Sequence, residues 1–497
     1  MTARTHAQSL GLQARRCAPE RVHVSSDDLA VSLPAPPRGR VAIAGASGFV
    51  GKALATLLAE QHDVIALGRS VPTSSAHPQI TYRRCDLYDT DQARAGLEGA
   101  TTAVYLVHSM LPSARLVQAS FSDLDVICAD NFARAAARAG VAHIVYLGGL
   151  IPVTDRLSEH LRSREEVERV LASHGATVTT LRAGMVIGPG GSSFRILLRL
   201  AQRLPWMVIP RWGACRAQPI GLDDVVRLLA FAVEHPEFAG KAYDVGSPSV
   251  MPYAEMLKST GRHLGRELRI LTLPFDVPVV SLMWVSAITQ APVDLVLPLV
   301  ESLKHEMVVE RGLELQRAAG FELATFDALM KATIRAEADT AKIATSVPRA
   351  KASPSLPSVV SLQRFTKPKT MSAREVANTY FSWLPSAMRP LIRVTPLAVH
   401  GASFWLAIWP RPLLELTLDQ AASDETRTVY RISGGDLASA HAKDAGTLEF
   451  RSVLGGELAT ALVSGFVPRL PWLIYKFSQA VVHLWVMRAF GRHLARR

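Results

Sequence analysis

The sequence predicts an α/β chain in which a doubly wound parallel sheet carries a small lobe and is followed by a separate α+β domain. From residue 40 to residue 174, short apolar strands alternate with helical patterns, as is typical of a parallel sheet covered on both faces. Ser, Pro, Ala and Lys then dominate residues 340–370 without any period, which indicates a linker. The predicted domains are a disordered leader at 1–38, the α/β domain with its lobe at 39–338, the linker at 339–371 and the α+β domain at 372–497.

Six apolar runs are expected to form the parallel strands, and the helices between them have recognisable ends. The helix 131–140 closes with a glycine at the C′ position, and the segment 158–174 carries an amphipathic stripe. The lobe is expected to contain helices 194–203 and 252–264, with a returning strand at 243–248 between them. The expected parallel strands are 40–44, 63–67, 80–84, 102–107, 143–147 and 177–181.

A glycine-rich turn follows the first strand and leads directly into a helix. Gly45 permits the tight exit from the strand, Gly48 allows a pyrophosphate to approach the backbone, and Gly51 allows the helix to pack closely on the sheet. The helix N-terminus then offers free N–H groups to the phosphates. The alternative interpretation is an ordinary tight turn.

The second strand ends in Gly68-Arg69-Ser70, where an acidic residue would normally hold the ribose 2′-hydroxyl of NAD. A guanidinium at this point suits a 2′-phosphate instead, so the sequence predicts NADP, with NADPH preferred over NADH. The alternative is a solvated arginine at the end of a strand.

These motifs, taken together, resemble the atypical and extended short-chain dehydrogenase/reductases, especially the NmrA-like NAD(P)H-binding group. The resemblance covers residues from about 40 to about 334 and implies a Rossmann-type fold. The segments that carry it are 45–51, Arg69, 85–87, 104–110, 131–133, 144–150, 181–184, 187–190 and 218–224.

The resemblance assigns roles to residues at the carboxyl ends of the strands. The implied cofactor residues are Gly45, Ser47, Gly48, Phe49, Val50 and Gly51 at the pyrophosphate, Arg69 and Ser70 at the 2′-phosphate, Asp86 and Leu87 at the adenine, Val107 and His108 along the ribose, and Gly148, Gly184 and Val186 near the nicotinamide.

The catalytic pair of the family, Tyr-x-x-x-Lys, is missing from this chain. By register His160 occupies the tyrosine position and Arg164 the lysine position. An imidazole can act as a proton donor, and the arginine could clamp ribose or phosphate but cannot titrate usefully. The alternatives are a surface histidine near a helix start and an ion pair between Arg164 and Glu168.

Composition limits the remaining classes of function. The net charge of +12 is the only feature that favours nucleic acid, so no nucleic-acid partner is expected. The four cysteines form no Cys-x-x-Cys pair, and no His cluster has ligand spacing, so we expect no disulfides, no metal site and a cytoplasmic location. The leader contains no signal-peptide core; its early arginines resemble a transit peptide, and a misassigned start codon is the alternative.

Residues 277–293 form an uncharged stretch that is interrupted by prolines and is shorter than a bilayer span. We expect a buried helix or pocket wall there, and therefore a small hydrophobic substrate or ligand.

The last domain is expected to contain a helix at 373–383, a β meander and a final helix at 472–492. The final helix is apolar nearly all round, which predicts burial, and its end is basic. A sheet that holds such a helix resembles the helix-grip fold of START-type ligand-binding domains. The alternative use of the helix is peripheral contact with a membrane, which would make the protein membrane-associated. The meander strands are expected at 403–409, 413–419, 427–433, 447–454 and 457–466.

Two functional interpretations remain open. The first is a reductase that uses NADPH on a hydrophobic carbonyl, enone or quinone. The second is a non-catalytic NADPH-binding redox sensor or assembly protein. The sequence leaves the oligomeric state and the direction of hydride transfer undetermined.

Overall fold

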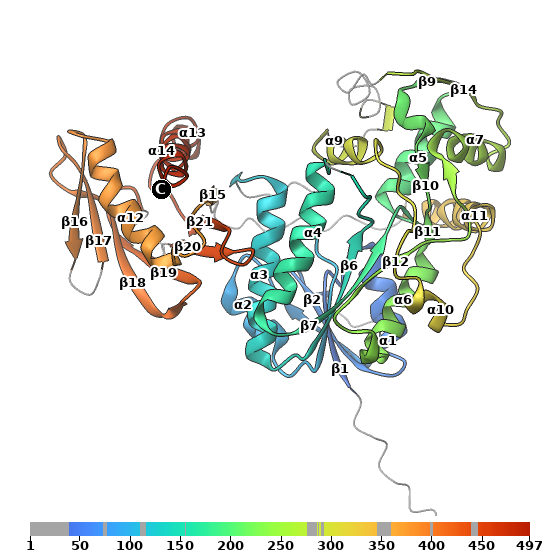
Figure 1. Ribbon diagram of the computed structural model, residues 1–497, viewed down its shortest axis with the longest axis horizontal. Helices are drawn as coiled ribbons and strands as arrows, with labels where there is room; N and C mark the ends of the chain where they lie inside the picture. Colours follow the sequence, from blue (N-terminus) through green and yellow to red (C-terminus); the bar gives the residue numbers. More distant parts are fainter. Residues whose placement is uncertain are drawn as a thin grey trace, which may run out of the picture. The chain divides into compact units, whose positions relative to one another are not determined.

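The first domain is built on a seven-stranded sheet in which every pairing of neighbouring strands is parallel (Figure 1). The strand order is β12-β7-β6-β4-β1-β2-β3. The computed structural model describes residues 39–72, 77–109, 116–154, 156–275, 286, 288–289, 293–344, 359–397, 401–438 and 446–497. The sheet strands are β1 (Arg40–Ala44), β2 (Asp63–Gly68), β3 (Ile80–Arg84), β4 (Thr102–Tyr105), β6 (His143–Gly149), β7 (Thr177–Ala183) and β12 (Ala242–Val245).

Two apolar layers cover this sheet, one on each face. Along β1, Ala42 and Ala44 pack against one helical layer, whereas Val41 and Ile43 pack against the other, because successive strand residues point to opposite faces. The doubly wound fold class is therefore confirmed. One layer contains α2 (Thr90–Leu97), α3 (Phe121–Ala139) and α4 (Glu159–Leu171), and the other contains α1 (Phe49–Leu58) and α6 (Leu222–Glu234).

Helix α3 begins about ten residues earlier than the sequence predicts. Ser120 caps its N-terminus by accepting the Asp123 N–H, and Gly140 ends it in the left-handed region at φ 74°. Its residues from 124 to 136 are all buried, so the sequence lacks the one-sided apolar stripe that marks a surface helix.

The lobe that follows the sheet is assembled from helices and three two-stranded pairs. The expected returning strand is confirmed, since β12 pairs with β7 at the edge of the main sheet. Most of the uncharged stretch 277–293 lies outside the described residues. The lobe elements are α5 (Ser192–Arg203), α7 (Tyr253–His263), α9 (Val293–Ser302), α10 (Glu314–Ala318) and α11 (Phe326–Ala344), with the pairs β8 (Val186–Ile187) and β11 (Ile220–Gly221), β9 (Trp206–Ile209) and β14 (Arg269–Thr272), and β10 (Arg216–Ala217) and β13 (Met251–Pro252).

The second sheet has eight strands in the order β16-β17-β18-β19-β20-β21-β15-β5. All its pairings are antiparallel except the one between β15 and β5. The predicted meander is confirmed, and β16 is an additional strand that the sequence analysis missed. The strands are β5 (Leu116–Gln118), β15 (Val359–Thr366), β16 (Ile392–Leu397), β17 (Gly401–Leu406), β18 (Pro412–Asp424), β19 (Arg427–Gly434), β20 (Thr447–Val453) and β21 (Leu458–Phe466).

The predicted linker 339–371 is wrong at both ends. Helix α11 continues to Ala344, and β15 is a buried strand of the second sheet. Moreover, β5 belongs to the first part of the chain but pairs with β15, so the second sheet is completed by a strand from outside the last domain.

The predicted final helix is wrong in two respects. It is broken at Ser478 into α13 (Trp472–Phe477) and α14 (Gln479–Leu494), because Ser478 has φ −122° and ψ −84°, outside the helical region. It is also not buried all round, since Phe477 and Trp485 are exposed. The inner side of α14 joins the core of the second sheet with α12 (Ala373–Ala387).

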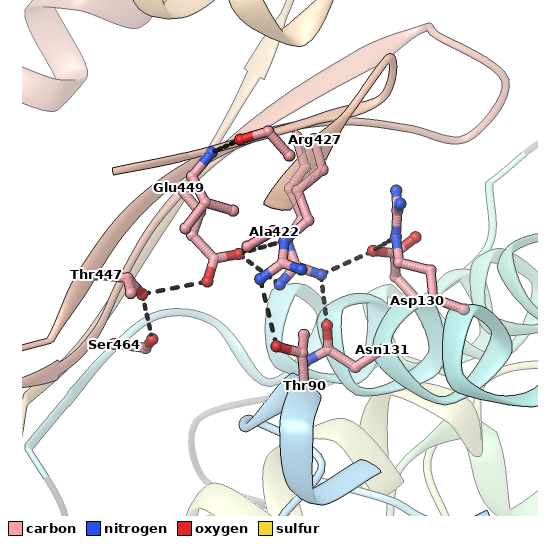
Figure 2. A network of polar contacts seen from close by, with 12 residues as sticks. Thr90, Asp130, Asn131, Ala422, Arg427, Thr447, Glu449 and Ser464 are labelled. Carbon is pink, nitrogen blue, oxygen red and sulfur yellow. Dashed lines mark hydrogen bonds and ion pairs between the residues drawn. The ribbon is translucent and has the colours of Figure 1, made fainter. Parts of the chain in front are cut away.

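A buried network of charges joins α3 to the second sheet (Figure 2). Arg451 donates to Glu449 at 2.7 Å and to Asp130 of α3 at 2.7 Å, and Arg427 donates to Glu449 at 2.9 Å. Burial alone would raise the pKa of Glu449, but the two arginines outweigh it and lower the pKa to about 2. The charged groups of this network are therefore stabilised by pairing with one another rather than by solvation.

Among the described residues, no helix has both the length and the apolar character required to cross a bilayer.

Candidate functional site

The turn between β1 and α1 has the geometry that a bound diphosphate requires. Gly45 has φ +87°, and its carbonyl accepts the Gly48 N–H at 2.9 Å. A Cβ on Gly51 would lie 2.2 Å from the Gly45 oxygen, so only glycine allows α1 to approach β1 this closely. The N-cap of α1 is Gly48, which supplies no side-chain cap, and this leaves the helix N-terminus open to a ligand.

A cavity of about 420 Å³ extends from this turn into the lobe. Its far walls are mostly apolar and include Trp212, Tyr253 and Met307. The cavity brings together most of the residues predicted for the site, from the carboxyl ends of β1, β4, β6 and β7, from β8 and from α4. The predicted residues that line it are Gly45, Gly48, Phe49, Val50, Gly51, Val107, His108, Gly148, His160, Arg164, Gly184 and Val186.

The residues predicted for the adenine and the 2′-phosphate lie outside this cavity. Arg69 and Ser70 are exposed just after β2, and Ser47 is close to them, with its Oγ 3.8 Å from where a Cβ on Gly68 would lie. Asp86 accepts the Tyr88 N–H at 3.2 Å, and Leu87 is buried. Their roles toward a cofactor remain predictions.

Arg84 is a second cation at this edge that the sequence analysis missed. In the parallel pairing of β2 with β3, Arg84 lies opposite Gly68, and its side chain is exposed. Arg69 and Arg84 therefore follow neighbouring strands at the same edge of the sheet. The sequence signal that could have identified Arg84 was its position at the end of the predicted third strand.

Arg164 does not pair with Glu168, which was the alternative expected from the sequence. Glu168 instead accepts from Arg182 at 3.0 and 3.1 Å. Arg164 is buried and donates to the carboxylate of Asp125, a fully buried residue of α3. A tertiary contact across 39 residues of sequence therefore replaces the local i, i+4 pair.

Asp125 is a further residue of the site that the sequence analysis missed. Besides Arg164, its carboxylate accepts the Ser109 N–H at 2.8 Å and the Ser163 hydroxyl at 3.1 Å. Asp125 therefore fixes Arg164 and the loop after His108 at the same time. The only signal in the sequence was an acidic residue within an apolar stretch of helix.

The two histidines of the site are stacked on each other. The His108 and His160 rings have centroids 5.5 Å apart and planes inclined by 16°. Burial, and then the nearby charge of Arg164, lowers the pKa of His160 to about 3. The imidazole is therefore neutral near pH 7, which argues against His160 as a charged proton donor.

His160 and Arg164 each keep a buried nitrogen with unused hydrogen-bonding capacity. Within the described part of the chain, neither Nδ1 of His160 nor Nε of Arg164 has a hydrogen-bond partner. Both side chains line the cavity. Because unsatisfied buried polar atoms are costly, these nitrogens are suited to a polar atom of a ligand.

The lowered pKa of His160 predicts a pH dependence of stability. The unfolded chain takes up this proton near pH 6.5 and the folded chain only near pH 3, so the free energy of unfolding falls as the pH decreases through this window. His160→Phe is expected to flatten that slope by up to about 1.4 kcal/mol per pH unit. Urea unfolding of the wild type and of His160→Phe at a series of pH values measures this slope. The difference between their free energies of unfolding above pH 6.5 gives the contribution of packing separately. Equal slopes for the two proteins would contradict the prediction.

Comparison with known proteins agrees with this geometry. Residues 45–202 match a family model described as NAD(P)H-binding. The first domain is an NAD(P)H-binding domain. This confirms the resemblance drawn from the glycine turn and the later strands.

The chain also has partial curated relatives. The auxiliary protein GraX of Staphylococcus aureus is 30% identical over 111 residues, which are 22% of this chain and 36% of that protein. The 3β-hydroxysteroid dehydrogenase/Δ5→4-isomerase of Mycobacterium tuberculosis is 30% identical over 161 residues, 28% of this chain and 43% of that protein. The chain thus spans less than half the length of either relative.

Solved structures resemble part of this chain. The NADPH-dependent quinone oxidoreductase of Escherichia coli, complexed with NADPH, has 18% identity and a TM-score of 0.48, covering 59% of this chain and 99% of that one. The Citrobacter triphenylmethane reductase complexed with NADP(H) has 16% identity, a TM-score of 0.48 and the same coverage.

Proposed function

We propose that this chain is an NADPH-dependent reductase of a hydrophobic carbonyl, enone or quinone. The observation that carries the proposal is the continuity of the cavity from the glycine turn to the apolar walls of the lobe. A reductase needs both halves, because the cofactor and the reducible group must be held next to each other in one cavity. The partial match to a steroid dehydrogenase supports the inclusion of bulky ring ketones among the candidate substrates.

The residues of the chain would bind and orient the reactants. The bound nicotinamide supplies a hydride. The turn from Gly45 to Gly51 and the N-terminus of α1 hold the diphosphate. His160 donates a neutral N–H and Arg164 a charged one toward the oxygen of the substrate, which favours negative charge on that oxygen. The proton itself comes from solvent, since neither side chain releases one near pH 7.

The preference for NADPH is proposed from Arg69 and Arg84. Arg69→Ala is expected to weaken NADPH binding by about tenfold or more, because a charge-assisted hydrogen bond to the 2′-phosphate contributes about 1.5–3 kcal/mol. The affinity for NADH should not change. Fluorescence titration of the wild type and the variant with both nucleotides measures this effect.

The control for that titration is Arg266→Ala, which removes an exposed arginine after α7 and far along the chain from β2. It should leave both affinities unchanged. An Arg69→Ala variant that lost NADPH and NADH affinity equally would argue against recognition of the 2′-phosphate.

The reductase proposal is tested by following NADPH oxidation at 340 nm with a panel of quinones, enones and ring ketones. We expect turnover with at least one apolar acceptor and its loss in Arg164→Met. Tight NADPH binding without turnover on any acceptor would instead support a redox sensor or assembly protein, which the missing Tyr-x-x-x-Lys pair also permits.

A further inference from the structure

The last two helices have an inner side that is sufficient to hold them in the fold. Met487, Phe490 and Leu494 of α14 are buried in the core of the second sheet. Phe490 packs edge-on against Phe365 of β15 at 5.5 Å and against Tyr380 of α12 at 5.1 Å. The attachment of α14 therefore does not depend on the residues of its other side.

The other side of these helices is apolar and faces solvent. Phe477 is 72% exposed, Trp485 is 55% exposed, and Ile474, Val481 and Val482 are each 54% exposed. Ile474 and Phe477 are three residues apart in α13, and in α14 Trp485 lies four residues after Val481 and three after Val482, so each helix presents its set on one side. We call these five residues the outer face. Grouped exposure of large apolar side chains marks an interaction surface rather than a folding requirement.

The chain segment that carries the outer face has charges of one sign. Residues 458–497 include six arginines and lysines and no aspartate or glutamate. Arg488 and Arg492 follow Trp485 at intervals of three and four residues, so they continue its side of α14; Arg496 lies just beyond the end of the helix, and all three are exposed. Apolar residues with a tryptophan on a helix that ends in arginines are typical of helices that lie in a membrane interface.

We propose that the outer face docks on an anionic membrane surface, with α13 and α14 lying in the interface. Helix α14 has 16 residues, fewer than the roughly 20 that a bilayer span requires, so it can lie on the membrane but not cross it. A second copy of the chain is a poorer occupant, because pairing two such faces would bring two sets of arginines together, and residues 458–497 supply no acidic residue to pair with them. Anionic headgroups compensate these charges while the acyl region takes the apolar side chains.

Vesicle flotation of the full chain tests the proposal. We expect flotation with vesicles of phosphatidylcholine and phosphatidylglycerol, weak binding to phosphatidylcholine alone, and release as the salt concentration rises. Arg488→Gln with Arg492→Gln should weaken binding by about fivefold for each arginine removed. Phe477→Ser with Trp485→Ser should weaken it by at least about tenfold, because two large apolar side chains are lost from the interface.

The matched control is Trp206→Ser, which removes a tryptophan of similar exposure, 59%, from β9 in the lobe. It should bind vesicles as the wild type does, and every variant should keep its NADPH affinity as proof of folding. Unchanged flotation of Phe477→Ser with Trp485→Ser, or equal loss in Trp206→Ser, would overturn the proposal. The proposal would also be overturned if the wild type does not bind vesicles and instead forms a dimer in light scattering that the double variant Phe477→Ser with Trp485→Ser dissociates.

Discussion

Gly51→Ala is expected to abolish measurable NADPH binding and to destabilise the fold. The added Cβ would lie 2.2 Å from the Gly45 oxygen and 2.8 Å from the Ala46 Cα, and both are backbone atoms that cannot rotate away. Either α1 moves off the sheet or the turn opens. Overpacking of this kind costs about 1–3 kcal/mol of stability. The displaced N–H groups would also lose the diphosphate, so affinity should fall by about 100-fold or more.

Fluorescence titration with NADPH and urea unfolding measure the two effects of Gly51→Ala. The matched control is Gly39→Ala, just before the other end of β1. There the added Cβ would meet only the His62 ring, at 3.3 Å, and this side chain can shift. Gly39→Ala should therefore keep NADPH affinity. An unchanged affinity in Gly51→Ala would mean that the diphosphate does not bind at this turn.

Gly51, where only glycine fits, and Gly39, where a side chain can be accommodated, illustrate why the first domain could be predicted from the sequence. A strand exit at positive φ and a close helix approach are local properties, and they leave glycines at fixed spacing in the sequence. Most of the parallel strands were equally readable, because β1, β2, β4 and β6 are short, largely apolar runs that are mostly buried. β1 and β3 were predicted with the same boundaries as in the structure.

The elements and contacts that were predicted wrongly share a physical cause, because each depends on residues far away in the sequence. β15 alternates as Val359-Val-Ser-Leu-Gln-Arg-Phe-Thr366, but it is surrounded by Ser and Pro and becomes a strand by pairing with β21 and β5. The break at Ser478 lies within a continuous apolar pattern. The partner of Arg164 could not be chosen from sequence, because Glu168 lies one turn away and Asp125 is brought close only by the packing of α3 on α4.

Asp125→Leu is expected to be the most destabilising single change in the site. It would leave the guanidinium of Arg164 buried, at 5% exposure, without its carboxylate. Removal of one partner of a buried ion pair costs about 3–5 kcal/mol, because the remaining charge is neither solvated nor paired. Urea unfolding measures this loss. Asp123→Leu, on the same helix, is the matched control, since Arg364 would still have Glu166 at 2.9 Å and the cost should be far smaller.

The double variant Asp125→Leu with Arg164→Met separates the stability of this pair from its proposed role in the reaction. With both charges gone, most of the lost stability should return, because an apolar pair of similar volume often replaces a buried ion pair without cost. Turnover of the acceptor should stay lost, since no charged N–H then lies at the junction of the glycine turn and the apolar walls. A stable double variant that still reduced its substrate would show that Arg164 serves the fold alone. A double variant as unstable as Asp125→Leu would show that the Ser109 and Ser163 contacts of Asp125, rather than its charge, hold α3 against the loop after His108 and against α4.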